Sequence, residues 1–277
     1  MSTAPRLAAV IGWPIAHSRS PALHGHWLRR YGIAGHYIPV AVDPARLAES
    51  LAALATLGFR GCNVTIPHKE AALALAAEAT PTARRIGAAN TLTFRADGGF
   101  SADNTDAYGF IASLRQSAPG WTASAGPALV LGAGGAARAV AAGLLDAGAP
   151  EVRLANRTRP RAEDLAAHVG GAIRVLDWAE AEAAMEGTAT IVNTTSLGMA
   201  GQPPLTLSLD AAPATALATD IVYQPLVTPF LAAAAARGLA TVDGLGMLLH
   251  QGAPGFEAWF GRVPEVDEDL RAAVLAA

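Results

Sequence analysis

The sequence predicts an α/β protein of two domains, built on largely parallel sheets with right-handed crossovers. Apolar runs of strand length alternate with alanine-rich stretches of helix length through most of the chain. Near the midpoint, a glycine-rich turn from Gly132 to Ala137 joins one such run to one such stretch. The length of 277 residues suits about two domains.

The composition is that of a compact protein with a sizeable core. Hydrophobic residues make up 52% of the chain and charged residues 16%. A net charge of −3 gives no basic surface for nucleic acid. The single cysteine, Cys62, excludes an internal disulfide. The chain has no uninterrupted apolar run long enough to span a bilayer, so we expect a cytoplasmic protein without a membrane partner.

The first strand, Leu7 to Gly12, ends in a loop that contains two serines. Ser20 and Pro21 form an N-cap and N1 pair for a helix that reaches about Gly32. For Ser20 alone, capping is the simpler interpretation. Ser18 and Ser20 together, after a strand and beside a helix N-terminus, could equally bind a carboxylate.

Two more strands follow, His36 to Val42 and Phe59 to Thr65, and Asp43-Pro44 caps the helix between them, which ends at Gly58. After the second of these strands comes an alanine-rich helix to about Ala79. Ligands of parallel α/β sheets bind beyond the carboxyl ends of the strands, so the loops that follow Gly12 and Thr65 lie on the ligand side.

Lys69 stands near the start of that alanine-rich helix, where a cation opposes the helix dipole. It is the only lysine in a chain with 20 Lys plus Arg. Most lysines are solvated surface residues. A lone lysine among arginines nevertheless indicates a group that must give up a proton, which arginine cannot do.

Thr80-Pro81 caps a short helix, and a strand begins within Gly87 to Leu92. The turn Asp97 to Gly99 makes a hairpin with Phe100 to Ala102. The polar cluster Asp103 to Gly109 then opens a helix, with a hinge expected near Asp106 to Gly109. Asp106 could be only an acidic residue in the first turn of a helix. The number of amide and carboxylate side chains directly after a strand nevertheless favours a functional site here.

The midpoint turn fits the dinucleotide fingerprint G-x-G-x-x-G/A. The strand Pro127 to Leu131 precedes Gly132, and a helix runs on to about Gly148. Gly132 permits the tight turn, and Gly134 lets backbone N–H groups approach a pyrophosphate. Small Ala137 allows the helix to pack closely on the strand.

The next strand, Val152 to Ala155, ends about 24 residues past Gly132, where NAD enzymes carry an acid for the ribose 2′-hydroxyl. No acid is present; arginines and a threonine, which suit a 2′-phosphate, follow Asn156. This selects NADP as the cofactor. The residues concerned are Arg157, Thr158 and Arg161.

The remaining strands complete the second sheet, and the polar loop Asn193 to Met199 lies at the cofactor edge. Two C-terminal helices, one starting after Asp243 and one from Pro264, are expected to return to the first domain. The seven histidines include no spaced pair on one helical face, so no metal site is expected. The strands are Ile173 to Val175, Thr190 to Val192, Ala216 to Tyr223 and Leu239 to Val242, with a Thr228-Pro229 helix before the last.

Taken together, these loops resemble the shikimate dehydrogenase family over nearly the whole chain. The motifs that carry the resemblance are Ser18 to Pro21, Asn63 to Lys69, Gly87 to Thr91, Asn104 to Asp106, Gly132 to Ala137, Asn156 to Thr158, Asn193 to Gly198 and Gly244 to Gln251. The resemblance implies NADPH-dependent reduction of 3-dehydroshikimate to shikimate in aromatic amino acid biosynthesis. It also implies a substrate domain of residues 1–106 and 244–277, and a Rossmann NADP-binding domain of residues 107–243.

The resemblance also implies roles for particular residues. Lys69 and Asp106 resemble the catalytic pair. Ser18 and Ser20 would bind the substrate carboxylate, with Tyr223 nearby. Thr65, Asn90, Asp106 and Gln251 would hydrogen-bond the ring hydroxyls. The cofactor residues would be Gly132, Ala133, Gly134, Gly135, Ala136, Asn156, Arg157, Thr158, Arg161, Thr195, Gly244 and Met247.

Two features depart from the family pattern: Gly25 replaces an asparagine common after the helix histidine, and Ala102-Asp103 replaces a commoner glycine before Asn104. The alternatives are a quinate/shikimate dehydrogenase that prefers NAD, a paralogue acting on an amino-shikimate analogue, and a non-catalytic NADP-sensing module. Arg157 and Arg161 oppose the NAD preference. The sequence leaves monomer and homodimer open.

Overall fold

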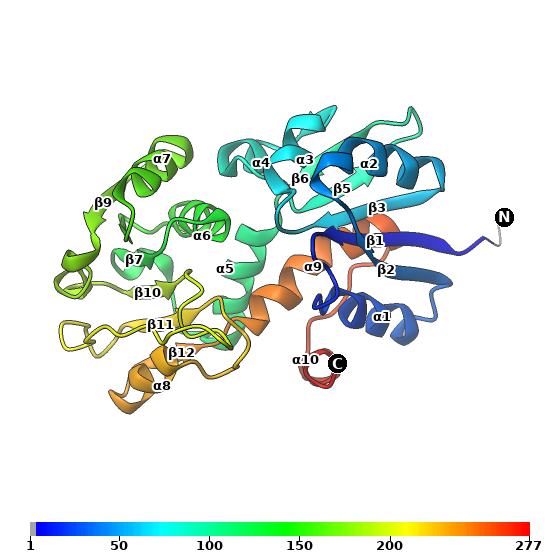
Figure 1. Ribbon diagram of the computed structural model, residues 1–277. Coiled ribbons are helices and arrows are strands. Elements are labelled where there is room, and N and C mark those ends of the chain that lie inside the picture. The colour runs from blue at the N-terminus through cyan, green and yellow to red at the C-terminus, as the bar shows by residue number, and fades with distance from the viewer. Residues whose placement is uncertain (1–3) are drawn as a thin grey trace. The chain divides into compact units, whose positions relative to one another are not determined.

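The computed structural model describes residues 4–277. The chain divides into two compact units, one of Met1–Thr105 with Leu249–Ala277 and one of Asp106–Leu248. Each unit contains a six-stranded sheet with helices, which confirms the predicted α/β class (Figure 1).

The sheet of the first unit has the strand order β2-β1-β3-β5-β6-β4. β1 pairs in parallel with β2 and β3, and β4 pairs in parallel with β6. β5 runs antiparallel to β3 and to β6, as the predicted hairpin requires. The strands are β1 (Arg6–Gly12), β2 (Gly35–Ala41), β3 (Phe59–Val64), β4 (Glu78–Ala79), β5 (Thr91–Phe94) and β6 (Phe100–Asp103).

Apolar residues that point to one face of this sheet pack against its helices. Ile11 and Val64 from the strands form a buried cluster with Leu51 and Ala72 from α2 and α3. The helices are α1 (Ser20–Arg30), α2 (Leu47–Thr56), α3 (Lys69–Leu75) and α4 (Pro81–Ile86), with a 3₁₀ turn, η1 (Pro44–Arg46), before α2. Thr80 caps α4 as predicted, since its hydroxyl accepts from the N–H of Ala83 at 3.1 Å.

Two local expectations were wrong. The alanine-rich helix ends at Leu75 instead of near Ala79, because Ala77 donates its N–H to the Phe100 carbonyl at 3.1 Å and the next two residues pair with β6 as β4. Strand pairing here overrides the helix propensity of alanine. Ser20 does not cap α1: it is the first helical residue, and its own N–H donates to the Ser18 hydroxyl at 3.3 Å.

The sheet of the second unit is parallel throughout, with the order β12-β11-β10-β7-β8-β9. This order is that of the doubly wound dinucleotide-binding fold. Its strands are β7 (Ala128–Leu131), β8 (Val152–Asn156), β9 (Ile173–Asp177), β10 (Thr190–Asn193), β11 (Leu217–Asp220) and β12 (Ala240–Val242).

The helices of this unit pack against its sheet, and the buried apolar residues between helices and sheet form the core. Leu129, Ile191 and Phe230 belong to one buried cluster. Thr228 caps α8 as predicted, accepting from the N–H of Leu231 at 3.3 Å. The helices are α5 (Asp106–Ser117), α6 (Gly135–Asp146), α7 (Arg159–Val169) and α8 (Pro229–Ala236), with 3₁₀ turns η2 (Ala123–Ala125), η3 (Trp178–Glu180) and η4 (Ala183–Met185).

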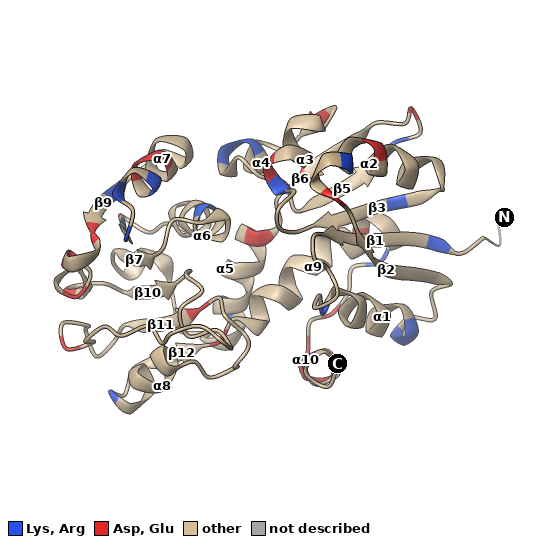
Figure 2. Cartoon of the chain, viewed as in Figure 1, with Lys and Arg blue, Asp and Glu red and all other residues tan. Residues whose placement is uncertain are grey.

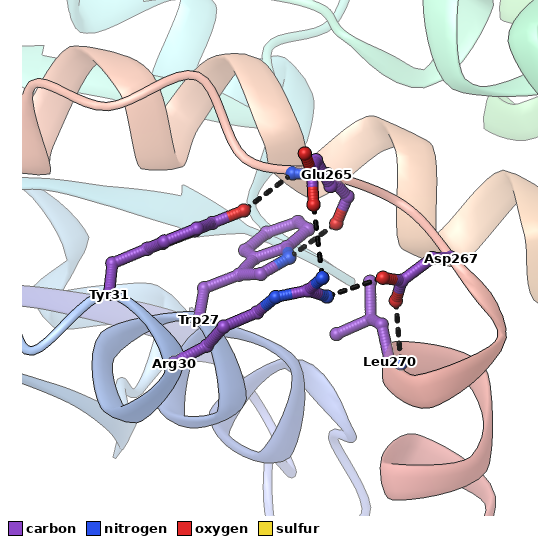
Figure 3. Close-up of polar contacts among 6 residues, drawn as sticks. All are labelled: Trp27, Arg30, Tyr31, Glu265, Asp267 and Leu270. Carbon is purple, nitrogen blue, oxygen red and sulfur yellow. Dashed lines mark hydrogen bonds and ion pairs between the residues drawn. The ribbon is translucent and has the colours of Figure 1, made fainter.

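The last two helices, α9 (Leu245–Phe260) and α10 (Glu268–Leu275), bring the chain back to the first unit from Leu249 onward. Trp259 of α9 donates its indole N–H to the Leu92 carbonyl at 3.0 Å. Figure 3 shows how the segment before α10 is held by α1 and by Tyr31, the residue that follows α1. Trp27 donates to the Glu265 carbonyl at 2.8 Å, and Arg30 pairs with the carboxylates of Glu265 and Asp267.

Within residues 4–277, every helix is too short or too polar to cross a membrane.

Candidate functional site

The carboxyl ends of β1 and β3 hold the first group of candidate residues. The N–H of Thr65 donates to the Ile11 carbonyl at 2.9 Å, and the N–H of Trp13 donates to the Ile66 carbonyl at 3.1 Å. The loop after β1, which carries Ser18, and the loop after β3, which carries Thr65, are therefore hydrogen-bonded where they leave the sheet. The sequence had placed both loops on the ligand side, and the structure brings their first residues together.

Asn90 is the centre of a buried polar network in the same unit. Its Oδ1 accepts from the Thr91 hydroxyl at 2.9 Å and from the N–H of Thr105 at 2.8 Å. Its Nδ2 donates to Oε1 of Gln251 at 3.3 Å. The Thr105 hydroxyl donates to the Gln251 carbonyl at 2.8 Å. Two predicted substrate-binding residues, Asn90 and Gln251, are thus joined directly although 161 positions separate them.

Lys69 is the first residue of α3 and is half-buried. Its carbonyl accepts from the N–H of Ala89 at 2.9 Å, which ties the start of α3 to the residue before Asn90. The neighbouring His68 is buried, and its ring Nε2 is hydrogen-bonded to the Val42 carbonyl at 2.9 Å. This fixed backbone contact supports the interpretation of His68 as a structural residue.

Asp106 is the first residue of α5 and is 7% exposed. It follows Thr105 directly, and Thr105 is hydrogen-bonded to both Asn90 and Gln251. The backbone that leads into Asp106 is therefore held by two of the candidate residues. Lys69 belongs to the first unit and Asp106 opens the second.

The glycine turn of the second unit leads from β7 into α6. Gly132 has a φ of +105°, which only glycine adopts without strain. A β-carbon there would lie 2.9 Å from both Thr194 Oγ1 and Thr195 Cγ2, so the predicted residue Thr195 lies beside the turn. Gly134 is the N-cap of α6, and no side chain caps the helix.

The space around this turn fits a pyrophosphate. A β-carbon added to Gly134 or Gly135 would meet nothing within 4 Å. The first N–H groups of a helix have no partner inside it and carry the positive end of the dipole. The turn Gly132 to Ala136 is therefore open to a ligand, and its backbone N–H groups are donors suited to an anion.

The end of β8 lies next to this turn, since the N–H of Gly132 donates to the Ala155 carbonyl at 2.8 Å. Asn156 donates its side-chain amide to the Thr158 carbonyl at 2.8 Å, which folds the following loop. Arg159 forms ion pairs with Glu163 and Asp177. Arg157 and Arg161 are exposed, and neither forms an ion pair with any residue of the described chain 4–277.

Helix α7 carries charges of both signs (Figure 2). Among the described residues 4–277, Arg157 and Arg161 are the cations near this strand end that form no ion pair. Arg138 of α6 is paired with Asp164 of α7 at 2.6 Å. Arg157 and Arg161 are the arginines that the sequence predicts to bind the 2′-phosphate, and their charges are available for an anion.

Asp220, which sequence reasoning did not select, organises the loops after β10 and β11. Its carboxylate accepts from Asn193 Nδ2 at 3.1 Å, from the N–H of Val222 at 2.9 Å and from the Thr228 hydroxyl at 2.8 Å. Burial raises the pKa of Asp220, and these hydrogen bonds oppose the rise. Asp220 therefore fixes the backbone just before Tyr223, which is half-buried.

The last predicted cofactor residues, Gly244 and Met247, lie at the start of α9. A β-carbon on Gly244 would lie 2.4 Å from the Ile221 carbonyl oxygen, so the chain packs closely against the end of β11 there. Met247 is half-buried. Like every other cofactor candidate, both belong to the second unit.

Comparison with known proteins agrees with this arrangement. Residues 10–92 match the family model of the shikimate dehydrogenase substrate-binding domain. Residues 116–200 match the shikimate/quinate 5-dehydrogenase model, and residues 244–274 match the shikimate 5′-dehydrogenase C-terminal domain.

Relatives matched over nearly their whole length are named shikimate or quinate dehydrogenases. The NADP(+) shikimate dehydrogenase of Paracoccus denitrificans is 64% identical over 270 residues, covering 98% of this chain and 96% of that protein. The shikimate 5-dehydrogenase of Thermus thermophilus, solved with NADP(H) and shikimate, is 40% identical with a TM-score of 0.87, covering 98% and 99%. A quinate dehydrogenase from Corynebacterium glutamicum, solved with NAD, is 30% identical with a TM-score of 0.91, covering 99% of each chain.

Proposed function

The chain belongs to the shikimate dehydrogenase family, and we propose that Lys69 and Asp106 act on the substrate while the second unit holds the dinucleotide. The protein is an NADP-dependent oxidoreductase that interconverts 3-dehydroshikimate and shikimate. The first unit takes the substrate, through residues of the loops after β1, β3 and α4 and of helix α9.

One observation carries the assignment of the catalytic pair. The two consecutive residues Ala89 and Asn90 hydrogen-bond to the carbonyl of Lys69 and to the N–H of Thr105, respectively. Lys69 and the residue preceding Asp106 are therefore both held by the same short stretch of chain. This supports the hypothesis that an ammonium group and a carboxylate, 37 positions apart in the sequence, serve one substrate.

The chemistry needs a proton donor at one oxygen. Hydride addition to the ketone of 3-dehydroshikimate leaves negative charge on that oxygen, and NADPH supplies the hydride when bound. The Lys69 ammonium gives its proton to this oxygen and becomes a neutral amine, which water reprotonates. The Asp106 carboxylate accepts hydrogen bonds from the ammonium and from the neighbouring substrate hydroxyl, and so orients both.

The remaining substrate residues bind the parts of the ring that do not react. We assign the substrate carboxylate to the hydroxyls of Ser18 and Ser20, with Tyr223 nearby. Thr65, Asn90 and Gln251 hydrogen-bond the ring hydroxyls. Asn90 and Gln251 are amides already fixed against each other, so they present their remaining donors and acceptors in set directions.

On the cofactor side, Gly132 to Ala136 hold the pyrophosphate through backbone N–H groups. Arg157, Thr158 and Arg161 hold the adenosine 2′-phosphate, and Asn156 shapes their loop. Thr195, Gly244 and Met247 complete the assigned cofactor residues. The open space at Gly134 and the two unpaired arginines support this assignment.

A spectrophotometric assay tests the function. Purified protein is mixed with shikimate and NADP⁺, and the absorbance of the reduced nicotinamide is followed, with quinate and NAD⁺ in parallel. We expect the highest kcat/KM for shikimate with NADP⁺. A higher kcat/KM for quinate with NAD⁺ would assign the quinate activity instead. A protein that only senses NADP would bind NADP⁺ and leave both acids unchanged.

We also propose that the protein is cytoplasmic and is a monomer or a homodimer. Light scattering after size-exclusion chromatography measures the mass, which is 28.2 kDa for one chain. A mass of three chains or more would contradict the proposed state.

A further inference from the structure

The carboxylate of Asp220 joins the ends of two neighbouring strands in the second unit. Asp220 ends β11 and is 1% exposed. Its Oδ1 accepts from the N–H of Val222 at 2.9 Å, and its Oδ2 accepts from the Thr228 hydroxyl at 2.8 Å. Nδ2 of Asn193, which ends the adjacent strand β10, lies 3.1 Å from both oxygens. Both carboxylate oxygens are therefore occupied, and Asn193 is bound by each of them.

The backbone of the loop after β10 fixes the orientation of the Asn193 amide. Its Nδ2 also donates to the Leu197 carbonyl at 3.1 Å, and a carbonyl can only accept. Its Oδ1 accepts from the N–H of Thr195 at 3.0 Å and from the Thr195 hydroxyl at 2.7 Å. Asp220 thus anchors the nitrogen end of this buried amide, while the oxygen end holds Thr195.

These contacts decide what Thr195 can offer to a ligand. Its hydroxyl gives its hydrogen to Asn193 and accepts from the N–H of Leu197 at 3.1 Å. A hydroxyl has one hydrogen and two lone pairs, so one lone pair remains among the contacts of residues 4–277. Thr195 is half-buried, and its Cγ2 lies beside the turn at Gly132. The remaining capacity of this hydroxyl is therefore that of an acceptor.

The strand order places Thr195 on the other side of the glycine turn from the arginines proposed for the 2′-phosphate. Strands β8 and β10 flank β7. Arg157 and Arg161 follow β8, whereas Thr195 follows β10. Dinucleotides bind across the strand ends at this point of the fold, with the pyrophosphate at the turn after the central strand. A dinucleotide with its adenosine 2′-phosphate at the end of β8 therefore extends its nicotinamide half toward β10.

We propose that Asp220, through Asn193, positions the Thr195 hydroxyl as a hydrogen-bond acceptor for a ribose hydroxyl or carboxamide N–H of the nicotinamide half. The proposal rests on the assignment of Thr195 to the cofactor. Asp220 is a positioning residue, because it acts on the ligand only through Asn193. With an amide at position 220, a single oxygen must serve three donors. The loop after β10 then populates other conformations, and only a fraction of molecules remains ready to bind.

The test is Asp220→Asn, which keeps the size of the side chain. Titration calorimetry measures the dissociation constants of NADP⁺ and of adenosine 2′,5′-bisphosphate, which carries the 2′-phosphate but lacks the nicotinamide half. We expect the constant for NADP⁺ to rise about threefold to tenfold and that for the bisphosphate less than about twofold. Arg157→Ala should weaken the binding of both ligands. Shikimate is left out, so that a displaced Tyr223 does not contribute.

The control Thr228→Val separates positioning from stability. It removes the cap of α8 and one hydrogen bond to Asp220, and it leaves the bonds that join Asp220, Asn193 and Thr195. We expect a lower melting temperature with the dissociation constant of NADP⁺ changed less than about twofold. An Asp220→Asn protein that melts lower but binds NADP⁺ as the native protein does would overturn the proposal, as would equal losses for NADP⁺ and the bisphosphate.

A double-mutant cycle with Thr195→Val tests whether Asp220 acts through Thr195. If it does, Asp220→Asn has almost no further effect on NADP⁺ binding in the Thr195→Val background. Equal fold-changes in both backgrounds would contradict the proposal. If Thr195→Val itself binds NADP⁺ normally, the assignment of Thr195 fails, and this result is distinct from a silent Asp220→Asn beside a defective Thr195→Val.

Asn193→Ala provides a second route if Asp220→Asn does not fold. It removes the amide that joins Asp220 to Thr195 and leaves the bonds of Asp220 to Val222 and Thr228. We expect the same selective loss, with NADP⁺ bound about threefold to tenfold more weakly and the bisphosphate nearly unchanged. Native affinity of Asn193→Ala for NADP⁺ would refute the positioning role.

Discussion

A β-carbon at Gly12 would lie only 2.6 Å from Cγ2 of Thr65. The same carbon would lie 2.9 Å from Ile15 Cδ1 and 3.3 Å from the Ile66 carbonyl oxygen. Gly12 ends β1, and Thr65 follows β3. The absence of a side chain at one strand end thus lets the neighbouring loop bring a proposed substrate residue close to the sheet.

Gly12→Ala should therefore damage substrate binding by moving Thr65. Overpacking of this kind forces shifts of side chains and backbone, and a displacement of about 1 Å at a binding group can reduce rate about a hundredfold. We expect kcat/KM for shikimate to fall at least about tenfold. The dissociation constant of NADP⁺ should stay unchanged, because the cofactor residues belong to the other unit.

The control for Gly12→Ala is Gly25→Ala. Gly25 lies within α1, and its added carbon would approach only Nη1 of Arg29, the flexible end of a side chain, at 3.3 Å. Alanine in a helix interior is more stable than glycine by about 0.5–1 kcal/mol, so this variant should melt no lower than the native protein and keep its activity. Full activity of Gly12→Ala would contradict the proposed role of Thr65.

Lys69→Ala should remove the proton donor and leave the cofactor site intact. We expect kcat to fall at least about a hundredfold, which is the usual contribution of one positioned acid-base group, with the dissociation constant of NADPH near normal. Lys69→Arg should be similarly slow, because a guanidinium keeps the charge but does not give up its proton. Steady-state kinetics and a fluorescence titration with NADPH measure the two quantities.

Glu70→Ala is the matched control, since Glu70 is the next residue of α3 and is exposed. It should keep the native kcat. A Lys69→Ala enzyme that retains most of its turnover would exclude Lys69 from the mechanism.

Sequence reasoning succeeded where the signal is local. The alternation of strands and helices, the hairpin of β5 and β6, and the Thr80 and Thr228 caps all depend on residues a few positions apart. It failed at the end of α3 because a longer-range contact decides where that helix stops. It also failed at Ser20, where α1 begins one residue earlier than expected and the Ser20 N–H donates to the Ser18 hydroxyl. Glu78 and Ala79 form a strand only because β6 is there to pair with them.

The network around Asn90 shows what sequence could not reveal about the site. Asn90 and Gln251 were selected by family resemblance, and their mutual hydrogen bond appears only in the fold. Asp220 was not selected because it is a single buried polar residue at the end of an apolar strand. A polar side chain facing a core is a signal for such residues, since buried polar groups need partners. Its partner cannot be identified before strand register is known.

Arg157→Ala should weaken NADP⁺ binding much more than NAD⁺ binding. Arg157 has no ion-pair partner within residues 4–277, so its charge remains available to a 2′-phosphate. Loss of a charge-assisted hydrogen bond should raise the dissociation constant of NADP⁺ about tenfold to a hundredfold, and that of NAD⁺ less than about twofold. Titration calorimetry with each dinucleotide measures both constants.

Arg174→Ala provides the comparison, because Arg174 is an exposed arginine of β9 in the same unit. It should leave both dissociation constants unchanged. Equal losses for NADP⁺ and NAD⁺ in Arg157→Ala would show that this residue does not bind the phosphate.

The stability of the first unit should fall in mild acid because of His24. Its side chain is fully buried between aromatic rings, and burial lowers its pKa from the ordinary 6.5 to about 3. The folded protein therefore keeps His24 neutral while the unfolded chain takes up a proton below pH 6.5. The stabilisation is complete above that pH and is lost progressively as the pH falls toward 3. At pH 5 the loss amounts to about 2 kcal/mol.

His24→Phe, which keeps an aromatic ring and removes the titrating group, should flatten this dependence. The measured quantity is the change in unfolding free energy between pH 7 and pH 5, from urea titrations at each pH, so that any constant packing difference cancels. His36→Gln, at an exposed position of β2, should leave the slope as in the native protein. Because the native protein and His24→Phe differ in no other titrating group, an unchanged slope in His24→Phe would mean that the buried ring does not resist protonation.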